Sequence, residues 1–304
     1  MPRFSVIIPT YNRATLLNEA LVSVFGQRCT DFEVLVVDDG STDQTAEVLL
    51  EFAGRIRVLR QANRGPGAAR NTACEHARGR YLAFLDSDDL WFPWTLESYD
   101  RAATDAGEPA FIAGKPAQFR TRDQLSAVTA SAVSAAVFAD YFDSGDQWRW
   151  YGASSFVVRA DAFRAVNGFT NDWINGEDAD LAMRLGTAAG FVQVVSPVTF
   201  GYRDHEGSAI SNVARTLQGA QYAVTMERAG AYPGGAARAR ERKTILTRLL
   251  RPIMIDGLRH GRRGEAWQLY RSTFFWHLEL GRWRFLAGFP VTAAGSLARS
   301  GSAS

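Results

Sequence analysis

The chain has 304 residues, of which 46% are hydrophobic, so it is neither a disordered nor a fibrous protein. Its 34 Lys and Arg residues nearly balance its 32 Asp and Glu residues, which argues against a general nucleic-acid binder. Cys29 and Cys74 are too few for a disulfide framework and favour a reducing compartment, and we expect no signal peptide and no membrane span.

In the first half of the chain, buried strand patterns alternate with helix patterns. Strands are expected over residues 4–8, 32–37, 56–59 and 81–85, with one amphipathic helix pattern in each interval. This alternation predicts parallel βαβ units, so all four strand ends should meet at one edge of the sheet. Pro9 is expected to end the first strand because it lacks an N–H group. Ser41 and Gln44 have the capping-box pattern, which predicts that the second helix starts there.

The fourth strand runs directly into three carboxylates, Asp86, Asp88 and Asp89. Carboxylates this close raise one another's pKa, so a cation among them makes the arrangement tolerable. Ligands bind at the carboxyl ends of strands in open α/β sheets, and we therefore predict a divalent-metal site that holds a phosphate-bearing substrate. The alternative is that these acids only cap the following helix. No GxGxxG pattern follows the first strand, which argues against a dinucleotide-dependent oxidoreductase.

The second half of the chain is less regular. A helix is expected over about residues 93–103, and strands over 110–113, 154–159, 191–195 and 198–202; no strand is predicted across 126–138. Glu177 and Asp178 open an amphipathic helix. From residue 212 onward only helix patterns remain, with breaks at 232–235 and 261–264, which predicts a C-terminal helical region.

Arginine and aromatic residues alternate near the C-terminus. The basic residues are Arg259, His260, Arg262, Arg263, Arg271, Arg282 and Arg284, and they interleave with Trp267, Tyr270, Phe274, Phe275, Trp276, Trp283 and Phe285. This composition suits a surface that lies on an anionic membrane or grips a protein partner. A basic solvated face over an aromatic core is the alternative.

Four motifs in order resemble those of the family 2 inverting glycosyltransferases. They are VIIPTYN (residues 6–12), VVDDGSTD (36–43), LDSDD (85–89) and GEDADL (176–181), and the resemblance covers about residues 3–210. It implies an α/β fold of the GT-A type, a Rossmann-like mixed sheet flanked by helices, followed here by the helical appendage. The expected division is a nucleotide-sugar-binding half (1–105), an acceptor-binding half (106–212) and the C-terminal helical region (213–304).

The resemblance also implies where the donor binds. The expected nucleotide-binding residues are Pro9, Thr10, Tyr11, Asn12, Asp39, Arg70, Asp86 and Ser87. Thr10, Tyr11 and Asn12 would flank the base, and Asp39 would accept the uracil N–H. Arg70 would reach the diphosphate, and Asp86 the ribose or a metal-bound water. Core packing for Tyr11 and an ordinary surface position for Arg70 are the alternatives.

The metal and the catalytic base follow from the same resemblance. Asp88, the second acid of the family's DXD motif, would bind Mn²⁺ or Mg²⁺ directly, and His205, after Tyr202 and Arg203, would be a further ligand. Imidazole favours manganese. In the Glu177 and Asp178 pair, Asp178 resembles the base that takes the proton of the acceptor hydroxyl. The alternatives are a loop histidine without a metal role and acids that only favour a helix N-terminus.

The expected function is transfer of a single sugar from a UDP-sugar to a glycan or lipid-linked acceptor, in cell-envelope or exopolysaccharide synthesis. Residues 147–150 (QWRW) are one residue too short for the Gln-x-x-Arg-Trp element of processive synthases and precede the Glu-Asp pair, so single transfer is favoured. We expect a cytoplasmic protein, with contact at the inner face of the plasma membrane as a further hypothesis. A nucleotidyltransferase and a non-catalytic nucleotide-sugar-binding protein are the alternatives.

Overall fold

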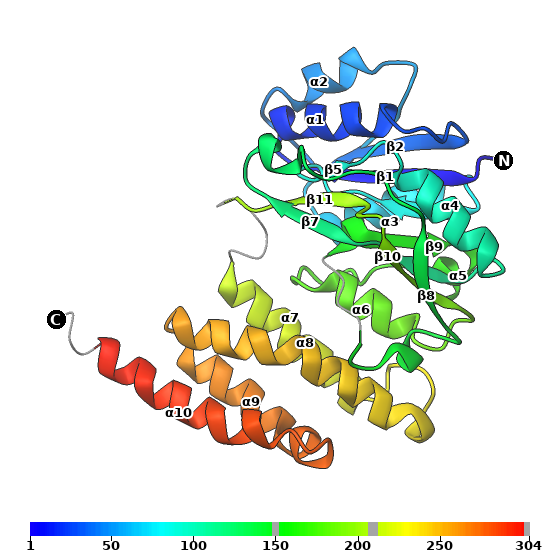
Figure 1. Ribbon diagram of the computed structural model, residues 1–304. Coiled ribbons are helices and arrows are strands. Elements are labelled where there is room, and N and C mark those ends of the chain that lie inside the picture. Colours follow the sequence, from blue (N-terminus) through cyan, green and yellow to red (C-terminus); the bar gives the residue numbers. More distant parts are fainter. Residues whose placement is uncertain (148–151, 206–211, 301–304) are drawn as a thin grey trace. The chain divides into compact units, whose positions relative to one another are not determined.

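The protein consists of two compact units in the computed structural model, which describes residues 1–147, 152–205 and 212–300 (Figure 1). The first unit comprises Met1–Tyr141, Trp148–Trp173 and Thr187–His205 and contains every described strand. The second comprises Phe142–Gln147, Ile174–Gly186 and Glu206–Ser304, and its described elements are all helical. The predicted boundaries near residues 105 and 212 stay predictions. The QWRW motif lies almost wholly at 148–151, outside the described residues.

A mixed eight-stranded sheet forms the centre of the first unit, in the order β3-β2-β1-β4-β9-β6-β10-β8. Its strands are β1 (Phe4–Thr10), β2 (Phe32–Asp38), β3 (Arg57–Arg60), β4 (Tyr81–Phe84), β6 (Phe111–Ala113), β8 (Ser134–Phe138), β9 (Phe156–Arg159) and β10 (Phe191–Ser196). The first four strands are parallel, as predicted. A small second sheet, β5-β11-β7, joins Leu90–Trp91, Phe200–Arg203 and Pro116–Phe119.

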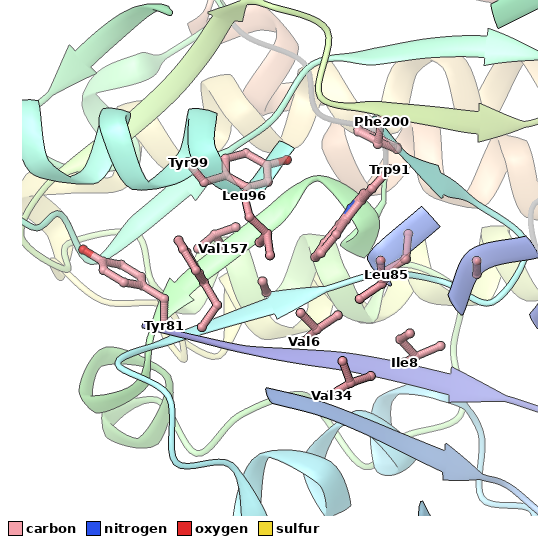
Figure 2. Close-up of a cluster of buried hydrophobic side chains, with 14 of the residues drawn as sticks. Val6, Ile8, Val34, Tyr81, Leu85, Trp91, Leu96, Tyr99, Val157 and Phe200 are labelled. Atoms are coloured by element: carbon pink, nitrogen blue, oxygen red, sulfur yellow. The ribbon is translucent and has the colours of Figure 1, made fainter. Parts of the chain in front are cut away.

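The core of the first unit follows from the period of two along the central strands. Alternate residues of β1 (Phe4, Val6 and Ile8) belong to one buried cluster, together with residues of β2, β4 and three helices (Figure 2). The unit's helices are α1 (Ala14–Phe25), α2 (Thr45–Glu51), α3 (Pro66–His76), α4 (Thr95–Asp105) and α5 (Ala160–Ala165). Leu17 and Leu21 of α1 and Tyr99 of α4 are fully buried in this cluster.

Two local predictions were wrong, one about the end of a strand and one about the start of a helix. Strand β1 does not end at Pro9 but pairs with β2 as far as Thr10. Successive residues of β1 direct their backbone polar groups alternately toward β4 and β2: Ile7 bonds to the β4 side and Thr10 to the β2 side. Pro9 therefore faces β4, where it could not donate a hydrogen bond. It is tolerated there because the pairing of β1 with β4 has already ended at Ile7. Ser41 does not cap a helix: its Oγ accepts the N–H of Asn12 at 3.0 Å, and α2 begins at Thr45.

Three strands were not predicted. They are β5, β7 and β8, which are two to five residues long. Strand β8 lies at the edge of the large sheet and is largely solvent-accessible, so it lacks the buried apolar run by which the central strands are recognised.

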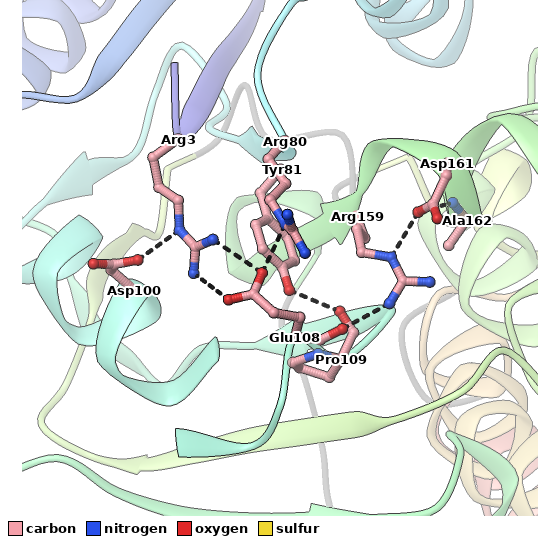
Figure 3. Close-up of polar contacts among 9 residues, drawn as sticks. All are labelled: Arg3, Arg80, Tyr81, Asp100, Glu108, Pro109, Arg159, Asp161 and Ala162. Carbon is pink, nitrogen blue, oxygen red and sulfur yellow. Dashed lines mark hydrogen bonds and ion pairs between the residues drawn. The ribbon is translucent and has the colours of Figure 1, made fainter. Parts of the chain in front are cut away.

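A charged network closes the edge of the sheet at which β1 and β4 begin (Figure 3). Arg3 donates to Asp100 at 2.6 Å and to both carboxylate oxygens of Glu108 at 2.9 and 2.8 Å. Arg80 also pairs with Glu108, at 2.8 Å, and the Tyr81 hydroxyl donates to the carbonyl of Pro109 at 3.0 Å. These contacts fasten the starts of both strands to α4 and to the turn that follows it.

The second unit consists of α6 (Glu177–Arg184), α7 (Val213–Arg228), α8 (Ala239–Arg259), α9 (Arg263–Glu279) and α10 (Trp283–Ser300), with short 3-10 turns. The predicted break at 232–235 falls between α7 and α8, whereas the one at 261–264 overlaps the start of α9 at Arg263. A buried ion pair joins Arg242 of α8 to Glu227 of α7 at 2.7 Å. None of the helices in the described part of the chain is long and apolar enough to cross a bilayer.

His277 is an unusual core residue of the second unit. Its side chain in α9 is fully buried, and neither ring nitrogen has a hydrogen-bond partner among the described residues. The imidazole lies 4.5 Å from the ring of Phe285, centroid to centroid. Burial, together with the charges of Arg282 and Arg251, lowers the pKa of His277 to about 4.

We expect His277 to make the protein less stable in mild acid. Between pH 6.5 and about 4, the histidine of the unfolded chain binds a proton that the folded chain does not accept, so the stability present above pH 6.5 is lost as the pH falls. From pH 7 to pH 5 this group should lower the free energy of unfolding by about 2 kcal/mol. Urea unfolding at both pH values should show a smaller loss for His277→Leu than for wild type; equal losses would contradict the assignment.

Candidate functional site

The carboxyl ends of β1, β2 and β4 meet at one edge of the sheet, as the βαβ pattern predicts. Thr10 is opposite Asp38 in the parallel register, and the N–H of Asp39 donates to the carbonyl of Thr10 at 2.9 Å. The N–H of Leu85 donates to the carbonyl of Ile7 at 3.0 Å. The segments that follow these strands therefore lie together, and they contain most of the predicted site residues.

The segment after β1 is held by the segment after β2. Asn12 has a left-handed backbone with φ 51°, and its Oδ1 accepts the N–H of Thr42 at 2.7 Å. The Tyr11 ring is 46% exposed, so the alternative that it packs in the core is wrong. Thr10 is buried, and its Oγ1 has no hydrogen-bond partner among the described residues. This end of β1 thus offers an open aromatic ring and an unsatisfied hydroxyl.

The Asp39 carboxylate is buried, and residues of the segment before α3 donate hydrogen bonds to it. Oδ1 accepts from Gln61 Nε2 at 2.7 Å and from the N–H of Arg64 at 3.0 Å, while Oδ2 accepts the N–H of Gly65 at 2.9 Å. Gly65 has φ +88°, and a Cβ there would lie 3.1 Å from the indole of Trp173. Glycine is thus required by the backbone angle and by the indole.

Arg70 is a buried residue, 3% exposed, so the alternative of an ordinary surface arginine is wrong. It lies in the second turn of α3, where one guanidinium nitrogen donates to Asp86 Oδ1. The guanidinium carbon is 5.2 Å from the centre of the Phe169 ring. Pairing and ring contact together stabilise a charge that burial alone would disfavour.

Asp86, Asp88 and Asp89 form one cluster, with a carboxylate oxygen of each within 4.8 Å of the others. They do not cap the next helix, because α4 begins only at Thr95. Instead the Asp86 N–H donates to Ser154 Oγ at 2.9 Å, and the Asp89 N–H donates to the Asp86 carbonyl at 3.1 Å. The alternative of a helix N-terminus is therefore wrong, and the turn itself presents the acids.

The side chains of Arg13 and His205 both contact the Asp88 carboxylate. Arg13 donates to Asp88 Oδ2, and His205 Nε2 lies 2.9 Å from the same oxygen. Burial raises the pKa of Asp88, but the contacts with His205 and Arg13 outweigh burial and hold that pKa below its usual range. His205 is therefore not an isolated loop histidine, and Asp88 is ionised at neutral pH.

Asp89 differs from its two neighbours. It is 2% exposed, and burial together with the charges of Asp88 and Asp86 raises its pKa well above the usual value. Its Oδ1 accepts the N–H of Arg203 at 2.9 Å. Asp89 is consequently a structural acid, while Asp86 and Asp88 have the more accessible oxygens.

The cluster has the chemistry of a divalent-cation site. Carboxylate oxygens suit Mg²⁺ and Mn²⁺, and a neutral imidazole nitrogen adds a ligand of the kind that Mn²⁺ accepts. Asp86, Asp88 and His205 come from two separate segments yet face the same space, because His205 Nε2 contacts the Asp88 carboxylate. The residues therefore fit the predicted metal, although its identity stays open between Mg²⁺ and Mn²⁺.

Glu177 and Asp178 are half-buried at the start of α6, in the second unit. Gly176 precedes them with a left-handed backbone, φ 101°, and Asp178 Oδ1 accepts the N–H of Ala179 at 2.7 Å. Helix α7 closely supports this start: a Cβ on Gly219 would lie 1.7 Å from the Asn175 carbonyl oxygen. Their catalytic role stays a prediction.

Sequence reasoning missed the residues that hold the site together. Arg13 and Arg203 each contact the Asp88 segment, and Ser154 binds the Asp86 N–H. Trp173 lies on Gly65. None of these contacts has a local signal, because each joins positions more than 60 residues apart in the chain. Arg13 is a partial exception, because it follows Asn12 in the segment after the first strand, which was expected at this edge, although its contact with Asp88 was not predicted.

A family model described as "Glycosyl transferase family 2" matches residues 5–152. The chain is 46% identical over 100 residues to the succinoglycan biosynthesis protein ExoW of Rhizobium meliloti, covering 31% of each protein. It is 43% identical over 95 residues to WfgD of Escherichia coli, named UDP-Glc:alpha-D-GlcNAc-diphosphoundecaprenol beta-1,3-glucosyltransferase, covering 31% of this chain and 38% of WfgD. The matching segment thus spans less than half the length of these relatives.

Solved structures share the fold. TarS 1-349 of S. aureus in complex with UDP-GlcNAc has a TM-score of 0.64 at 21% identity, covering 82% of this chain and 72% of that one. The mannosyltransferase PcManGT of Pyrobaculum calidifontis, in complex with GDP-Man and Mn²⁺, has a TM-score of 0.51 at 20% identity, covering 96% and 86%. At these identities the likeness establishes the fold alone, and this is the predicted GT-A fold.

The turn that binds Asp39 should be sensitive to a single methyl group. Gly65→Ala strains the left-handed backbone, pushes against Trp173 and displaces the N–H that binds Asp39, so we expect a loss of about 3 kcal/mol in unfolding free energy. Gly54 is the matched control, because its φ is +79° and nothing lies within 4 Å of a Cβ built there. Gly54→Ala should cost only about 1 kcal/mol. Equal losses in urea unfolding would mean that backbone strain alone explains the effect.

Proposed function

Because residues 5–152 match the model of glycosyl transferase family 2, we propose that this protein is an inverting glycosyltransferase that moves a single sugar from a UDP-sugar to an acceptor hydroxyl. One observation carries the proposal: Asp39, Arg70, Asp86, Asp88 and His205 gather at a single sheet edge of a GT-A fold. We place the reaction in cell-envelope or exopolysaccharide synthesis, which the names of ExoW and WfgD support.

In this proposal Asp39 selects the base. A carboxylate accepts about four hydrogen bonds, and Asp39 receives three from Gln61, Arg64 and Gly65, which leaves capacity for the imide N–H of uracil. The half-exposed Tyr11 ring offers a face on which a base can stack. Thr10 and Asn12 complete the wall beside it, Pro9 fixes the backbone there, and Ser87 belongs to the acidic turn. The UDP-sugar complex of TarS supports the choice of a uridine donor.

Asp88 and His205 would hold a divalent cation, and Asp86 would contact the ribose or a metal-bound water. The bound cation would neutralise the negative charge that develops on the departing diphosphate. We favour Mn²⁺, because imidazole is among the ligands and the PcManGT structure contains Mn²⁺. Arg70 supplies a further positive charge for the diphosphate from within the first unit.

Asp178 is the proposed base, with Glu177 beside it. An acceptor hydroxyl is a weak nucleophile until a base removes its proton during attack. The N–H of Ala179 fixes Oδ1 of Asp178, which orients the carboxylate at the start of α6. Attack on the anomeric carbon from the face opposite the diphosphate inverts that centre, and no covalent enzyme intermediate is needed. The acceptor is proposed to be a glycan or a lipid-linked sugar, as the name of WfgD suggests.

The test is turnover of nucleotide sugars by purified protein. A panel of UDP- and GDP-sugars is first compared by thermal shift with Mn²⁺ and with chelator, and the best donor is then assayed for nucleotide release. Asp88→Ala and Asp178→Asn should each lower turnover at least about 100-fold, while the matched control Asp172→Asn, an exposed acid before α6, should not. Release of pyrophosphate would identify a nucleotidyltransferase, and a thermal shift without product would identify a binding protein.

We also propose that the C-terminal helices contact an anionic membrane at its cytoplasmic face. Phe275 and Leu278 of α9 are 74% and 38% exposed, and Trp283 and Val291 of α10 are 63% and 72% exposed. Exposed arginines accompany them, among them Arg271 and Arg284. Exposed apolar side chains among cations are what a lipid surface with negative headgroups attracts. The alternative, a basic solvated face over an aromatic core, does not account for the exposure of Phe275 and Trp283.

Charge introduced into this surface should release the protein from vesicles. Phe275→Glu and Trp283→Glu should each lower sedimentation with phosphatidylglycerol vesicles several-fold, because a carboxylate is repelled by the lipid and cannot enter it. Leu50→Glu in α2 is the control, since Leu50 is 72% exposed and distant in sequence from the C-terminal helices. Unchanged sedimentation of both variants, or an equal loss in Leu50→Glu, would contradict membrane contact by this surface.

A further inference from the structure

Arg203 lies where the strand register brings the acidic turn and the His205 segment together. Strand β11 ends at Arg203, two residues before His205, and β5 begins at Leu90, directly after Asp89. The two strands are antiparallel with Gly201 opposite Leu90, so the register continued by two residues places Arg203 opposite Asp88. The ladder therefore aligns the main chain that bears Asp88 with the main chain that leads to His205.

Two hydrogen bonds from Arg203 fix this alignment. The backbone N–H of Arg203 donates to Asp89 Oδ1 at 2.9 Å, and its Nε donates to the carbonyl oxygen of Asp88 at 2.8 Å. The same residue thus holds the acidic turn through its main chain and through its side chain. His205 Nε2, two residues on, lies 2.9 Å from Asp88 Oδ2.

A third hydrogen bond of Arg203 joins its guanidinium to a residue of helix α1. Its Nη2 donates to Glu19 Oε2 at 2.7 Å, and Glu19 belongs to α1. The guanidinium carbon lies 4.6 Å from the centre of the Phe119 ring, and the Arg203 side chain is only 11% exposed. A guanidinium offers donors in a fixed plane, so binding at Glu19 determines the direction in which Nε points at Asp88.

From these contacts we propose that Arg203, oriented by Glu19, is a positioning residue that sets the distance between the Asp88 carboxylate and the His205 imidazole. The inference rests on the metal site of the proposed function and extends it: divalent-cation affinity depends on a residue that does not itself ligate the cation. Outer groups that orient ligands typically change metal affinity by about 10- to 100-fold when removed. Lysine cannot replace Arg203, because one ammonium cannot reach both Glu19 and the Asp88 carbonyl with the same planar geometry.

The experiment is a titration of the full chain with Mn²⁺ followed by the electron paramagnetic resonance of free Mn²⁺, with and without UDP. Arg203→Gln and Arg203→Lys should each raise the Kd for Mn²⁺ at least about 10-fold, and Glu19→Gln should raise it by a smaller factor. Arg122→Gln is the matched control. Arg122 also pairs with Glu19, at 3.6 Å, but its side chain is 58% exposed and contacts no residue of the acidic turn in the described structure, so its loss should leave the Kd unchanged.

UDP binding in the presence of chelator separates positioning from damage to the fold. It should be unchanged in all four variants, because the Asp39 carboxylate is held in the described structure by Gln61, Arg64 and Gly65 and not by Arg203. Wild-type Mn²⁺ affinity in Arg203→Gln would overturn the inference and leave the proposed function intact. If Arg203→Gln does not fold, Glu19→Gln decides, since it retains Arg203 but frees its guanidinium. An absence of Mn²⁺ binding by the wild-type chain, with and without UDP, would instead overturn the proposed metal dependence.

Discussion

The first unit depends on one electrostatic constraint: the carboxylates that β2 and β4 bring to a single sheet edge must each be compensated. Parallel strands concentrate these acids because their carboxyl ends meet. Asp86 is paired with Arg70, and Asp88 with Arg13 and His205. Asp89 is compensated differently, by a raised pKa that favours its protonated form. The edge is therefore stable without a bound cation and remains ready for one.

This compensation links the architecture to the proposed chemistry. A nucleoside diphosphate and a divalent cation would arrive with opposite charges, so the edge can take up both with little net change in charge. Arginines that pair with acids in the free protein, such as Arg70, would in this proposal bind oxygen atoms of the diphosphate. Arg203 differs from these arginines, because its hydrogen bonds to the Asp88 carbonyl and to Glu19 hold the site together. We expect these bonds to be present both with and without bound donor.

The second unit meets a different requirement, since helices without a sheet must bury their faces against one another. Glu227 and Arg242 form a buried ion pair between α7 and α8, and His277 is buried without a partner in the described structure. Such polar groups lower stability compared with apolar ones. Helix α7 also packs closely against the backbone just before α6, where Gly219 lies beside the carbonyl oxygen of Asn175. The proposed base therefore lies on a helix whose start is held by this close contact.

The sequence by itself determined the parallel βαβ half, the acidic strand ends and the family motifs. These features are written in buried apolar runs and in residues next to one another, such as Asp86 to Asp89. Folding decided what the motifs do not contain: the exposed edge strand β8, the contact of Ser41 with Asn12 in place of a helix cap, and the hold of Arg203 on Asp88. Local patterns report contacts within about one helical turn or one strand period. Partners such as Asp88 and Arg203, which are 115 positions apart, become neighbours only when the chain is folded.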